Sequence, residues 1–370
     1  MLQFKNKKFD QMDMGTFFIM LSLIGLGLLN LYSATFISGK GSVSSIFISQ
    51  TMWVLLGFLA MVLAIVIDYK YLDKLAWVLY GLICLALIYV LVAERSIAGS
   101  KRWIDLGFFR FQPSEVTKLV MIIVLAKYFS SISKASDYVL KDLLVPLLII
   151  AFPSLLILKE PDLGTCIVII LVSFSIIFHI GLNYKSLLKI IISTLVAIPI
   201  MWFFVLKEYQ KDRIRVFLDP AKDPLGDAWH ITQSIIAVGS GMLFGKGFMS
   251  GTQNRLEFVP KQHTDFIFSV CAEEWGFLGC FIVLALFFFL IARGIAISSK
   301  LKDRFAAILT AGVVFMLFWH TFINIGMELD ILPVVGIPLP FMSYGGSAMV
   351  MNMICIGLII NVQLRKHQFA

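Results

Sequence analysis

An acidic residue stands at the head of a long apolar segment in the stretch PKQHTDFIF, residues 260–268. Asp265 carries the carboxylate, and His263 lies two residues before it. Ionisable groups at membrane depth are costly and are usually retained for function. A carboxylate placed here can act as a general base. The structural alternative is a helix-terminal carboxylate that is favoured by the helix dipole, with Thr264 as a nearby cap.

A second cluster, GSKRWIDLGFFRFQPSEVTK, combines positive charge with aromatic residues. Its cations are Arg102, Arg110 and Lys118. Pro113 suits the first position of a helix, where Glu115 and Lys118 would share one face. Either the charges bind an anion, or Glu115 and Lys118 neutralise each other and the aromatic residues form an interfacial belt.

Two further clusters predict turns or broken backbone. KEPDLGT (159–165) is a tight turn that contains Asp162, and turn chemistry alone accounts for its Pro, Asp and Gly. The segment at 332–352 contains three prolines, Ser343 and a Gly-Gly pair at membrane depth. Non-helical backbone survives there only where it is buried in protein or lines a cavity. The sequence therefore predicts a cavity near the start of the last helix.

Composition identifies the environment of these clusters. Apolar residues make up 59% of the 370 residues and charged residues 15%, with a mean hydropathy of +0.91. Soluble domains contain roughly 25% charged residues, so this composition indicates a membrane protein. The net charge of +8 does not require nucleic acid, because membrane proteins retain Lys and Arg on the cytoplasmic side. The five cysteines lie in apolar runs and are expected to be core residues.

Ten apolar stretches approach the roughly 20 residues that a helix needs to cross hydrocarbon. The sequence thus predicts an all-α integral membrane protein with a single polytopic domain over residues 1–370. The predicted spans are 14–36, 46–67, 75–94, 114–130, 142–158, 163–182, 186–206, 264–292, 304–327 and 341–363.

The distribution of positive charge predicts the orientation. With both termini in the cytoplasm, 16 of the 31 Lys and Arg residues lie inside and 15 outside. Eight of the outer ones fall in the segment 207–263, and long loops contribute little to orientation. We therefore expect cytoplasmic termini and a large extracytoplasmic loop at 207–263. That loop should contain an amphipathic helix at 229–239, followed by glycines suited to close backbone contact.

Five motifs, in this order, resemble the signatures of the SEDS family (shape, elongation, division and sporulation). They are KRWIDLGFFRFQPSE, EPDLGT, FLDPAKDPLGDAWHITQSIIAVGSG, LEFVPKQHTDFIFSVCAEEWG and PLPFMSYGGS. The resemblance covers nearly the whole chain and is greater to the elongation member than to the division member. It implies a ten-helix glycosyltransferase that polymerises lipid II into peptidoglycan strands at the outer face of the cytoplasmic (inner) membrane during cell elongation and shape maintenance. It also implies a class B penicillin-binding protein as the partner that supplies the transpeptidase.

The residues agree with this chemistry. The leaving group of lipid II is a lipid pyrophosphate, which is already a stable anion. The reaction therefore needs one base and positive charge but no general acid. Asp265 is the predicted base. The phosphates are expected to bind Arg102, Arg110, Lys118 or a divalent cation such as Mg²⁺ or Mn²⁺, whose ligands the sequence does not identify. The other candidate substrate-binding or supporting residues are Glu115, Asp162, His263, Thr264 and Ser343.

Glu273 and Glu274 follow Asp265 in the same predicted helix. Eight residues of helix would separate Asp265 from Glu273 by about 12 Å, wider than paired carboxylates need. We expect these glutamates to brace the helix instead.

Three alternatives remain open: a lipid II flippase, a scaffold for the penicillin-binding protein, and a glycosyltransferase of the division type. A flippase needs polar groups along a path to both faces, whereas the inner halves of the predicted spans are nearly uncharged. Neither a flippase nor a scaffold needs a base at Asp265.

Overall fold

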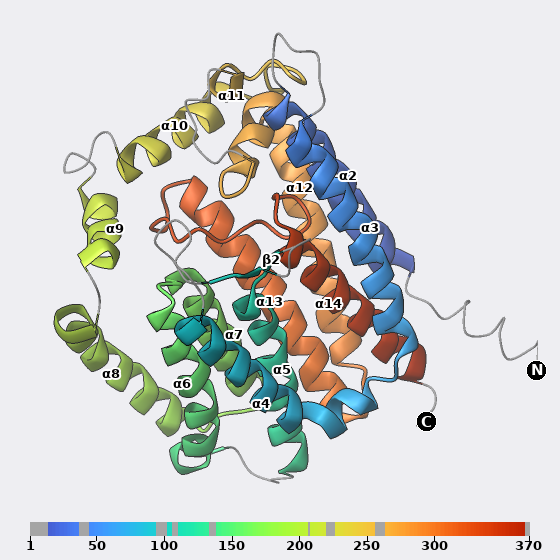
Figure 1. The fold of residues 1–370 in the computed structure, drawn as a ribbon, viewed down its shortest axis with the longest axis vertical. Helices are drawn as coiled ribbons and strands as arrows, with labels where there is room; N and C mark the ends of the chain where they lie inside the picture. The colour runs from blue at the N-terminus through green and yellow to red at the C-terminus, as the bar shows by residue number, and fades with distance from the viewer. Residues whose placement is uncertain are drawn as a thin grey trace, which may run out of the picture.

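A computed structural model describes residues 14–36, 44–93, 102–105, 110–132, 138–205, 208–219, 226–255 and 263–366. Within them the chain is a bundle of long helices with three short ones beside one end (Figure 1). An antiparallel hairpin of two short strands, β1 (Ile104–Asp105) and β2 (Arg110–Phe111), precedes the fourth long helix. The helices are α2 (Met14–Thr35), α3 (Ser45–Val66), α4 (Lys70–Ala93), α5 (Pro113–Ser131), η1 (Leu140–Leu143), α6 (Leu144–Lys159), α7 (Leu163–His179), α8 (Tyr184–Ile200), η2 (Met201–Val205), α9 (Glu208–Leu218), α10 (Asp227–Ser240), α11 (Thr252–Arg255), α12 (Ile267–Ser298), α13 (Arg304–Glu328) and α14 (Gly346–Arg365).

Every predicted span coincides with a helix. Seven helices in the described part of the chain are long and apolar enough to cross a membrane. The other three predicted spans are α5, which carries three charged residues, and α7 and α8, each of 17 residues. The chain is therefore an all-α, multi-pass membrane protein.

Three predicted helix starts are wrong. The third span was expected from residue 75, but α4 begins at Lys70. The eighth span was expected from residue 264 and the last from residue 341, but α12 begins at Ile267 and α14 at Gly346. In both places a turn or extended backbone precedes the helix. Hydropathy averaged over a window does not register these breaks, because the strongly apolar residues that follow dominate the average.

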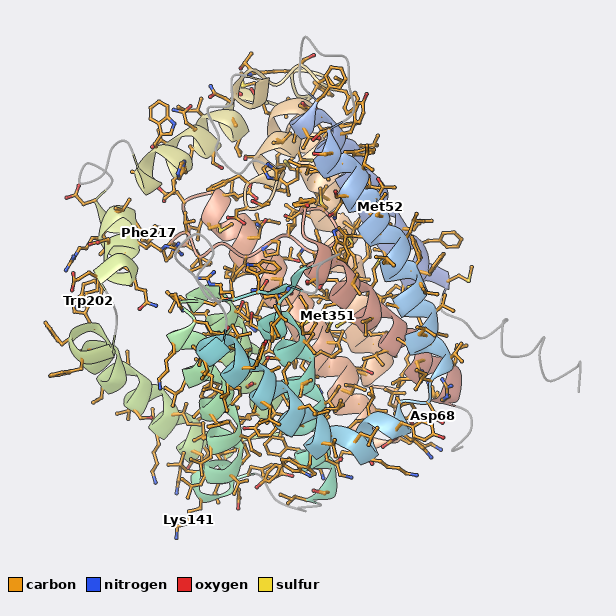
Figure 2. The ribbon with its side chains drawn as sticks, in the orientation of Figure 1. Met52, Asp68, Lys141, Trp202, Phe217 and Met351 are labelled. Carbon is orange, nitrogen blue, oxygen red and sulfur yellow. The ribbon has the colours of Figure 1, made fainter. Side chains whose placement is uncertain are left out.

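The bundle is organised around α13, which packs against α5, α7, α12 and α14. In its most apolar window 72% of the residues are buried, compared with 22% for α3. Figure 2 shows the same contrast between side chains: Met52 on α3 points away from the bundle, and Met351 on α14 is buried within it. Residues on α13 are therefore placed by packing from several sides.

The segment 207–263, here called the outer loop after its expected location, clamps a break in α12. Gly276 interrupts this helix with a φ of 65°. The backbone groups at the break bond the glycine-rich segment 241–247 instead: the Phe277 N–H donates to the Met242 carbonyl (2.8 Å), and the Lys246 N–H donates to the Glu273 carbonyl (3.0 Å). The predicted amphipathic helix is present as α10. Close backbone contact is present at Gly241 and Gly245 but not at Gly239, which has open space around it.

Glu273 and Glu274 hold this clamp together. The Glu273 carboxylate accepts bonds from the Lys246 ammonium (2.7 Å) and the Thr252 N–H (2.8 Å). The Ser33 hydroxyl on α2 donates to Glu274. These carboxylates thus join α12 to the outer loop and to α2, and neither lines the cavity described below.

The clamp predicts opposite effects for two glycine substitutions. A Cβ at Gly245 would lie 2.1 Å from the Glu274 carbonyl oxygen at a φ of +77°, so Gly245→Ala must shift the backbone. Gly239, within α10, has open space around its Cβ position, so Gly239→Ala should be neutral or stabilising by up to about 1 kcal/mol. We expect a lower thermal unfolding temperature in detergent for Gly245→Ala only. Equal unfolding temperatures for the two variants would contradict the clamp.

Candidate active site

A cavity of about 430 Å³, here called the main cavity, lies where the ends of several helices meet. Its walls come from the starts of α5 and α7, the turn before α12, the C-terminal part of α13 and the segment that leads into α14. Spans that alternate in direction bring these chain positions to the same side of a membrane. The predicted convergence of the polar clusters, and the predicted cavity beside the broken backbone, are both present.

The structure brings seven of the predicted site residues into this cavity and leaves out Ser343, while the side chain of Arg110 lies outside the described residues. Its lining includes Arg102, Glu115, Lys118, Asp162, His263, Thr264 and Asp265. Ser343 is not among the lining residues: it is buried, and its hydroxyl accepts a bond from the Leu339 N–H (2.8 Å) within the broken segment. The backbone of Arg110 pairs with Asp105 in the hairpin, and its side chain lies outside the described residues.

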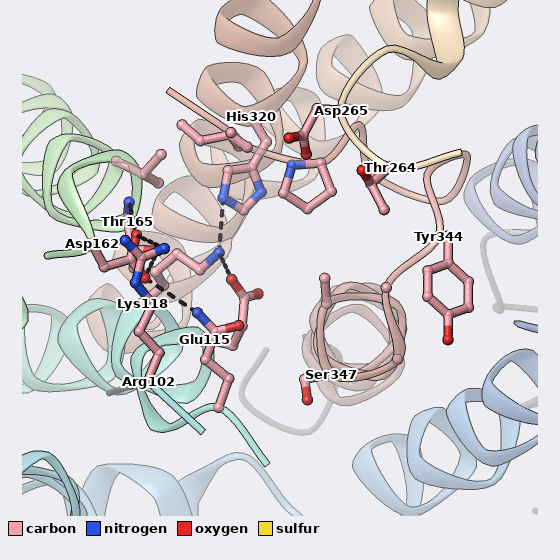
Figure 3. A pocket seen from close by; sticks show the side chains of 18 of the residues that line it. Arg102, Glu115, Lys118, Asp162, Thr165, Thr264, Asp265, His320, Tyr344 and Ser347 are labelled. Carbon is pink, nitrogen blue, oxygen red and sulfur yellow. Dashed lines mark hydrogen bonds and ion pairs between the residues drawn. The ribbon is translucent and has the colours of Figure 1, made fainter. Parts of the chain in front are cut away.

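Glu115 and Lys118 form a buried ion pair that includes a third residue. The Lys118 ammonium donates to Glu115 Oε1 (2.8 Å) and contacts His320 Nε2 (3.0 Å), as Figure 3 shows. Because a lysine ammonium only donates, His320 Nε2 must be the acceptor, which makes His320 neutral with its proton on Nδ1. His320 lies in the apolar sequence of α13 among a few other polar residues, such as Thr321 and Asn324, so the sequence marks it only weakly.

Asp162 caps α7 and ties the 159–165 turn to the hairpin region. It accepts bonds from the Thr165 N–H (3.3 Å), the Thr165 hydroxyl (3.0 Å) and the Gln112 amide (3.2 Å). Arg102 donates to the carbonyls of Glu160 and Pro161 in the same turn, and its guanidinium lies 3.9 Å from Asp162. Turn chemistry therefore accounts for Asp162, while its side chain still faces the main cavity.

Asp265 sits two residues before α12, at a backbone position fixed by α13. The Asn324 amide donates to the carbonyls of Asp265 (3.0 Å) and Ile337 (2.9 Å). Glu328 caps α12 by accepting from the backbone N–H groups of Phe268 (3.2 Å) and Ser269 (2.6 Å). Thr264 is thus not the cap of this helix.

The broken segment lies against the Asp265 carboxylate. A Cβ built on Gly336, whose φ is +70°, would be 3.6 Å from Asp265 Oδ2. On the other side of the turn, the Tyr344 N–H donates to the His263 carbonyl (2.9 Å). Desolvation lowers the pKa of His263 and the charge of Asp265 partly opposes this, so His263 is neutral at pH 7. Figure 3 shows Thr264, Asp265 and Tyr344 across the cavity from Arg102 and Asp162.

The described residues do not fit a resident metal site. No group of three His, Cys, Asp or Glu side chains in this part of the chain is placed to hold an ion. Of the carboxylates in the main cavity, Glu115 is paired with Lys118 and Asp162 is held by several donors. A divalent ion bound at these residues would need further ligands, such as substrate phosphates, which often hold Mg²⁺.

Comparison with known proteins identifies the family. Residues 14–368 match the family model of the cell cycle proteins FtsW, RodA and SpoVE. Peptidoglycan glycosyltransferase MrdB of Escherichia coli K12, a RodA protein, is 42% identical over 286 residues, which are 77% of each chain. The probable peptidoglycan glycosyltransferase FtsW of Nitrosomonas europaea is 36% identical over 92% of this chain and 90% of its own length.

A solved structure shares both the fold and the sequence pattern. It is described as "Structural coordination of polymerization and crosslinking by a peptidoglycan synthase complex", and its matching chain is 31% identical, with a TM-score of 0.82 over 96% of this chain and 99% of that one. The present chain belongs to the SEDS family of cell cycle proteins. It is a peptidoglycan glycosyltransferase most like RodA, as the five motifs predicted.

Glu160 gives this region a predicted dependence on pH. It is fully buried, and neither carboxyl oxygen has a hydrogen-bond partner among the described residues. Desolvation, reinforced by Asp162 and opposed by Arg102, raises the pKa of Glu160 to about 8. The folded state therefore holds a proton that the unfolded state loses near its ordinary value of 4.5, and stability falls as the pH rises from 4.5 to 8.

Glu160→Gln keeps the shape but cannot ionise. We expect thermal unfolding of this variant in detergent to vary less between pH 5 and pH 9 than that of the parent, with the largest gain in stability at pH 9. The same pH dependence in both proteins would show that Glu160 is not the group responsible.

Proposed function

We propose that this protein polymerises lipid II at the outer face of the cytoplasmic membrane, with Asp265 as the general base. The observation that carries the proposal is the position of the Asp265 carboxylate, which lines the main cavity from a backbone site held by Asn324. The other two carboxylates of the cavity serve different purposes. Glu115 neutralises Lys118, and Asp162 caps α7.

In the proposed step, an acceptor sugar hydroxyl attacks the anomeric carbon of the donor. The new bond forms between that oxygen and that carbon, and the bond from the carbon to the pyrophosphate oxygen breaks. The pyrophosphate leaves with the electron pair, and the hydroxyl proton passes to Asp265. Removal of a proton from the attacking hydroxyl contributes about 10²–10⁴-fold to such reactions. Because His263 is neutral, it does not supply positive charge beside Asp265.

We further propose that the elongation role, rather than the division role, belongs to this chain, and that a class B penicillin-binding protein is its partner. Identity is higher to MrdB than to FtsW, 42% against 36%, although over a smaller share of the chain. The similar solved structure is a synthase complex that coordinates polymerisation with crosslinking. A transpeptidase partner would supply that second activity here.

Asp265→Asn tests the base directly. The amide keeps the shape of the carboxylate but cannot take a proton, so we expect polymerisation of labelled lipid II by the purified protein and its partner to fall by about 10²-fold or more. Asp265→Glu should also be weak, since a displacement of about 1 Å can cost about as much. The length and amount of glycan strands, with the transpeptidase blocked, are the measurements.

Asp330→Asn is the matched control. It is the same type of substitution, at a residue outside the main cavity in the turn after α13. It should keep parental activity. Long strands at the parental rate from Asp265→Asn would remove the base assignment, because polymerisation would then not need a carboxylate at this position.

Orientation is tested by cysteine labelling. Phe244, in the outer loop, is 78% exposed, and Lys300, between α12 and α13, is also exposed. An impermeant maleimide should label Phe244→Cys in intact cells or spheroplasts and Lys300→Cys only after lysis. The parent, with its five native cysteines, supplies the background. Labelling in the reverse order would invert the proposed topology and place the termini outside.

A further inference from the structure

A second, smaller cavity of about 190 Å³, here called the side cavity, adjoins the main one. The two share Arg102, Asp162, Asp265 and Gly336. The side cavity also receives Arg213 from α9 and His230 from α10. Asp265 thus stands in the wall between two spaces, one built mainly from the bundle and the other completed by the outer loop.

The two cavities differ in charge. The shared residues contribute the same charges to both. Beyond these, the main cavity adds Lys118 and Glu115, which cancel as an ion pair at 2.8 Å. The side cavity adds Arg213 and no further carboxylate among its described lining residues. With the shared Arg102, Asp162 and Asp265, the side cavity is therefore formally neutral and the main cavity carries a net charge of −1, so the side cavity is the more favourable place for an anion.

The side cavity also has hydrogen-bonding capacity that the protein does not use. One N–H of Arg213 donates to the Val334 carbonyl (3.3 Å), and this is its only hydrogen bond among the described residues. A guanidinium has five N–H donors arranged to bind phosphate. His230 Nδ1 is buried, with no hydrogen-bond partner in the described part of the chain. Since buried polar atoms in proteins are usually paired, both groups fit a bound ligand.

The volumes of the two cavities also indicate which part of the substrate each one can hold. Sites for drug-sized ligands usually measure about 300–1,000 Å³, so the main cavity can take a sugar, whereas the side cavity suits a smaller group. The main cavity is also lined by Trp103, Gln112 and Tyr344, which offer aromatic faces and an uncharged amide.

We propose that the side cavity binds the pyrophosphate of the donor, through Arg213 and His230, and that the main cavity holds sugar. This proposal rests on the proposed glycosyl transfer. The leaving pyrophosphate, which takes the electron pair of the broken bond, gathers its negative charge beside Arg213. The hydroxyl proton goes to Asp265 in the dividing wall. Lys118, expected from the sequence to bind the phosphates, instead shapes the main cavity with Glu115 and His320.

The test measures binding without turnover. Inorganic pyrophosphate and farnesyl pyrophosphate are titrated against the purified full-length chain in lipid nanodiscs. Arg213→Met should weaken binding of both about tenfold or more, which is the scale of a hydrogen bond to a charged group. Arg213→Lys, which keeps the charge but loses the planar fork, should lie between Arg213→Met and the parent.

Arg215→Met is the matched control on the same helix. Arg215 is bonded to Glu208 and Asp212, is 43% exposed in its side chain and lines neither cavity. It should bind pyrophosphate within about twofold of the parent. His230→Phe, which fills the space and removes the ring nitrogens, should weaken binding as Arg213→Met does, and it serves if Arg213→Met does not fold.

Two outcomes overturn the proposal. If Lys118→Met abolishes pyrophosphate binding while Arg213→Met does not, the anion lies in the main cavity. If parental affinity persists in both Arg213→Met and His230→Phe, the side cavity is not the anion site. Asp265→Asn separates a failure of this proposal from a failure of the proposed base: the variant should still bind pyrophosphate although it does not polymerise lipid II. Active Asp265→Asn together with weak binding by Arg213→Met would refute the base and leave the side cavity standing.

Discussion

The site depends on one side chain that joins two breaks in the membrane bundle. Backbone groups that leave a helix at membrane depth must find partners inside the protein. Asn324 meets this need twice, since its amide donates to the carbonyl before α12 and to the carbonyl at residue 337 in the broken segment before α14. Because α13 is among the most buried helices, both non-helical segments are fixed relative to the centre of the bundle. The Asp265 carboxylate takes its position from that bond.

Buried charged groups, like buried backbone groups, need partners inside the protein. Removing one member of a buried pair leaves an uncompensated charge at a cost of about 3–5 kcal/mol. Glu115, Lys118 and His320 therefore behave as one neutral unit with fixed hydrogen bonds, and they shape a polar wall that carries little net field. An anionic substrate must find its counter-charge elsewhere, which makes the cations of the outer loop chemically significant.

The described part of the outer loop is attached to α12 by backbone and side-chain bonds. The break at Gly276 exposes backbone groups of α12, and the segment 241–247 bonds them. Glu273, with Lys246 and Thr252, closes the same contact through side chains. Since α10 also packs on α12, the loop is held beside the turn that carries Asp265. The bundle and this loop are thus fixed relative to each other around Asp265.

The sequence by itself determined the class, the ten helices, the helix start at Pro113, the break before the last helix and the polar residues that meet in the main cavity. These follow from local causes: the apolar length that spans hydrocarbon, the fixed φ of proline and the cost of charge at membrane depth. Only the tertiary structure decided the starts of α12 and α14, the use of Ser343 within the broken segment, and the roles of His320, Asn324 and Glu328. His320, Asn324 and Glu328 each act on a partner that is distant in sequence, such as Lys118 for His320 or Asp265 for Asn324. A polar residue within an apolar helix looks the same in sequence whatever it contacts, because its partner is chosen by packing across the bundle.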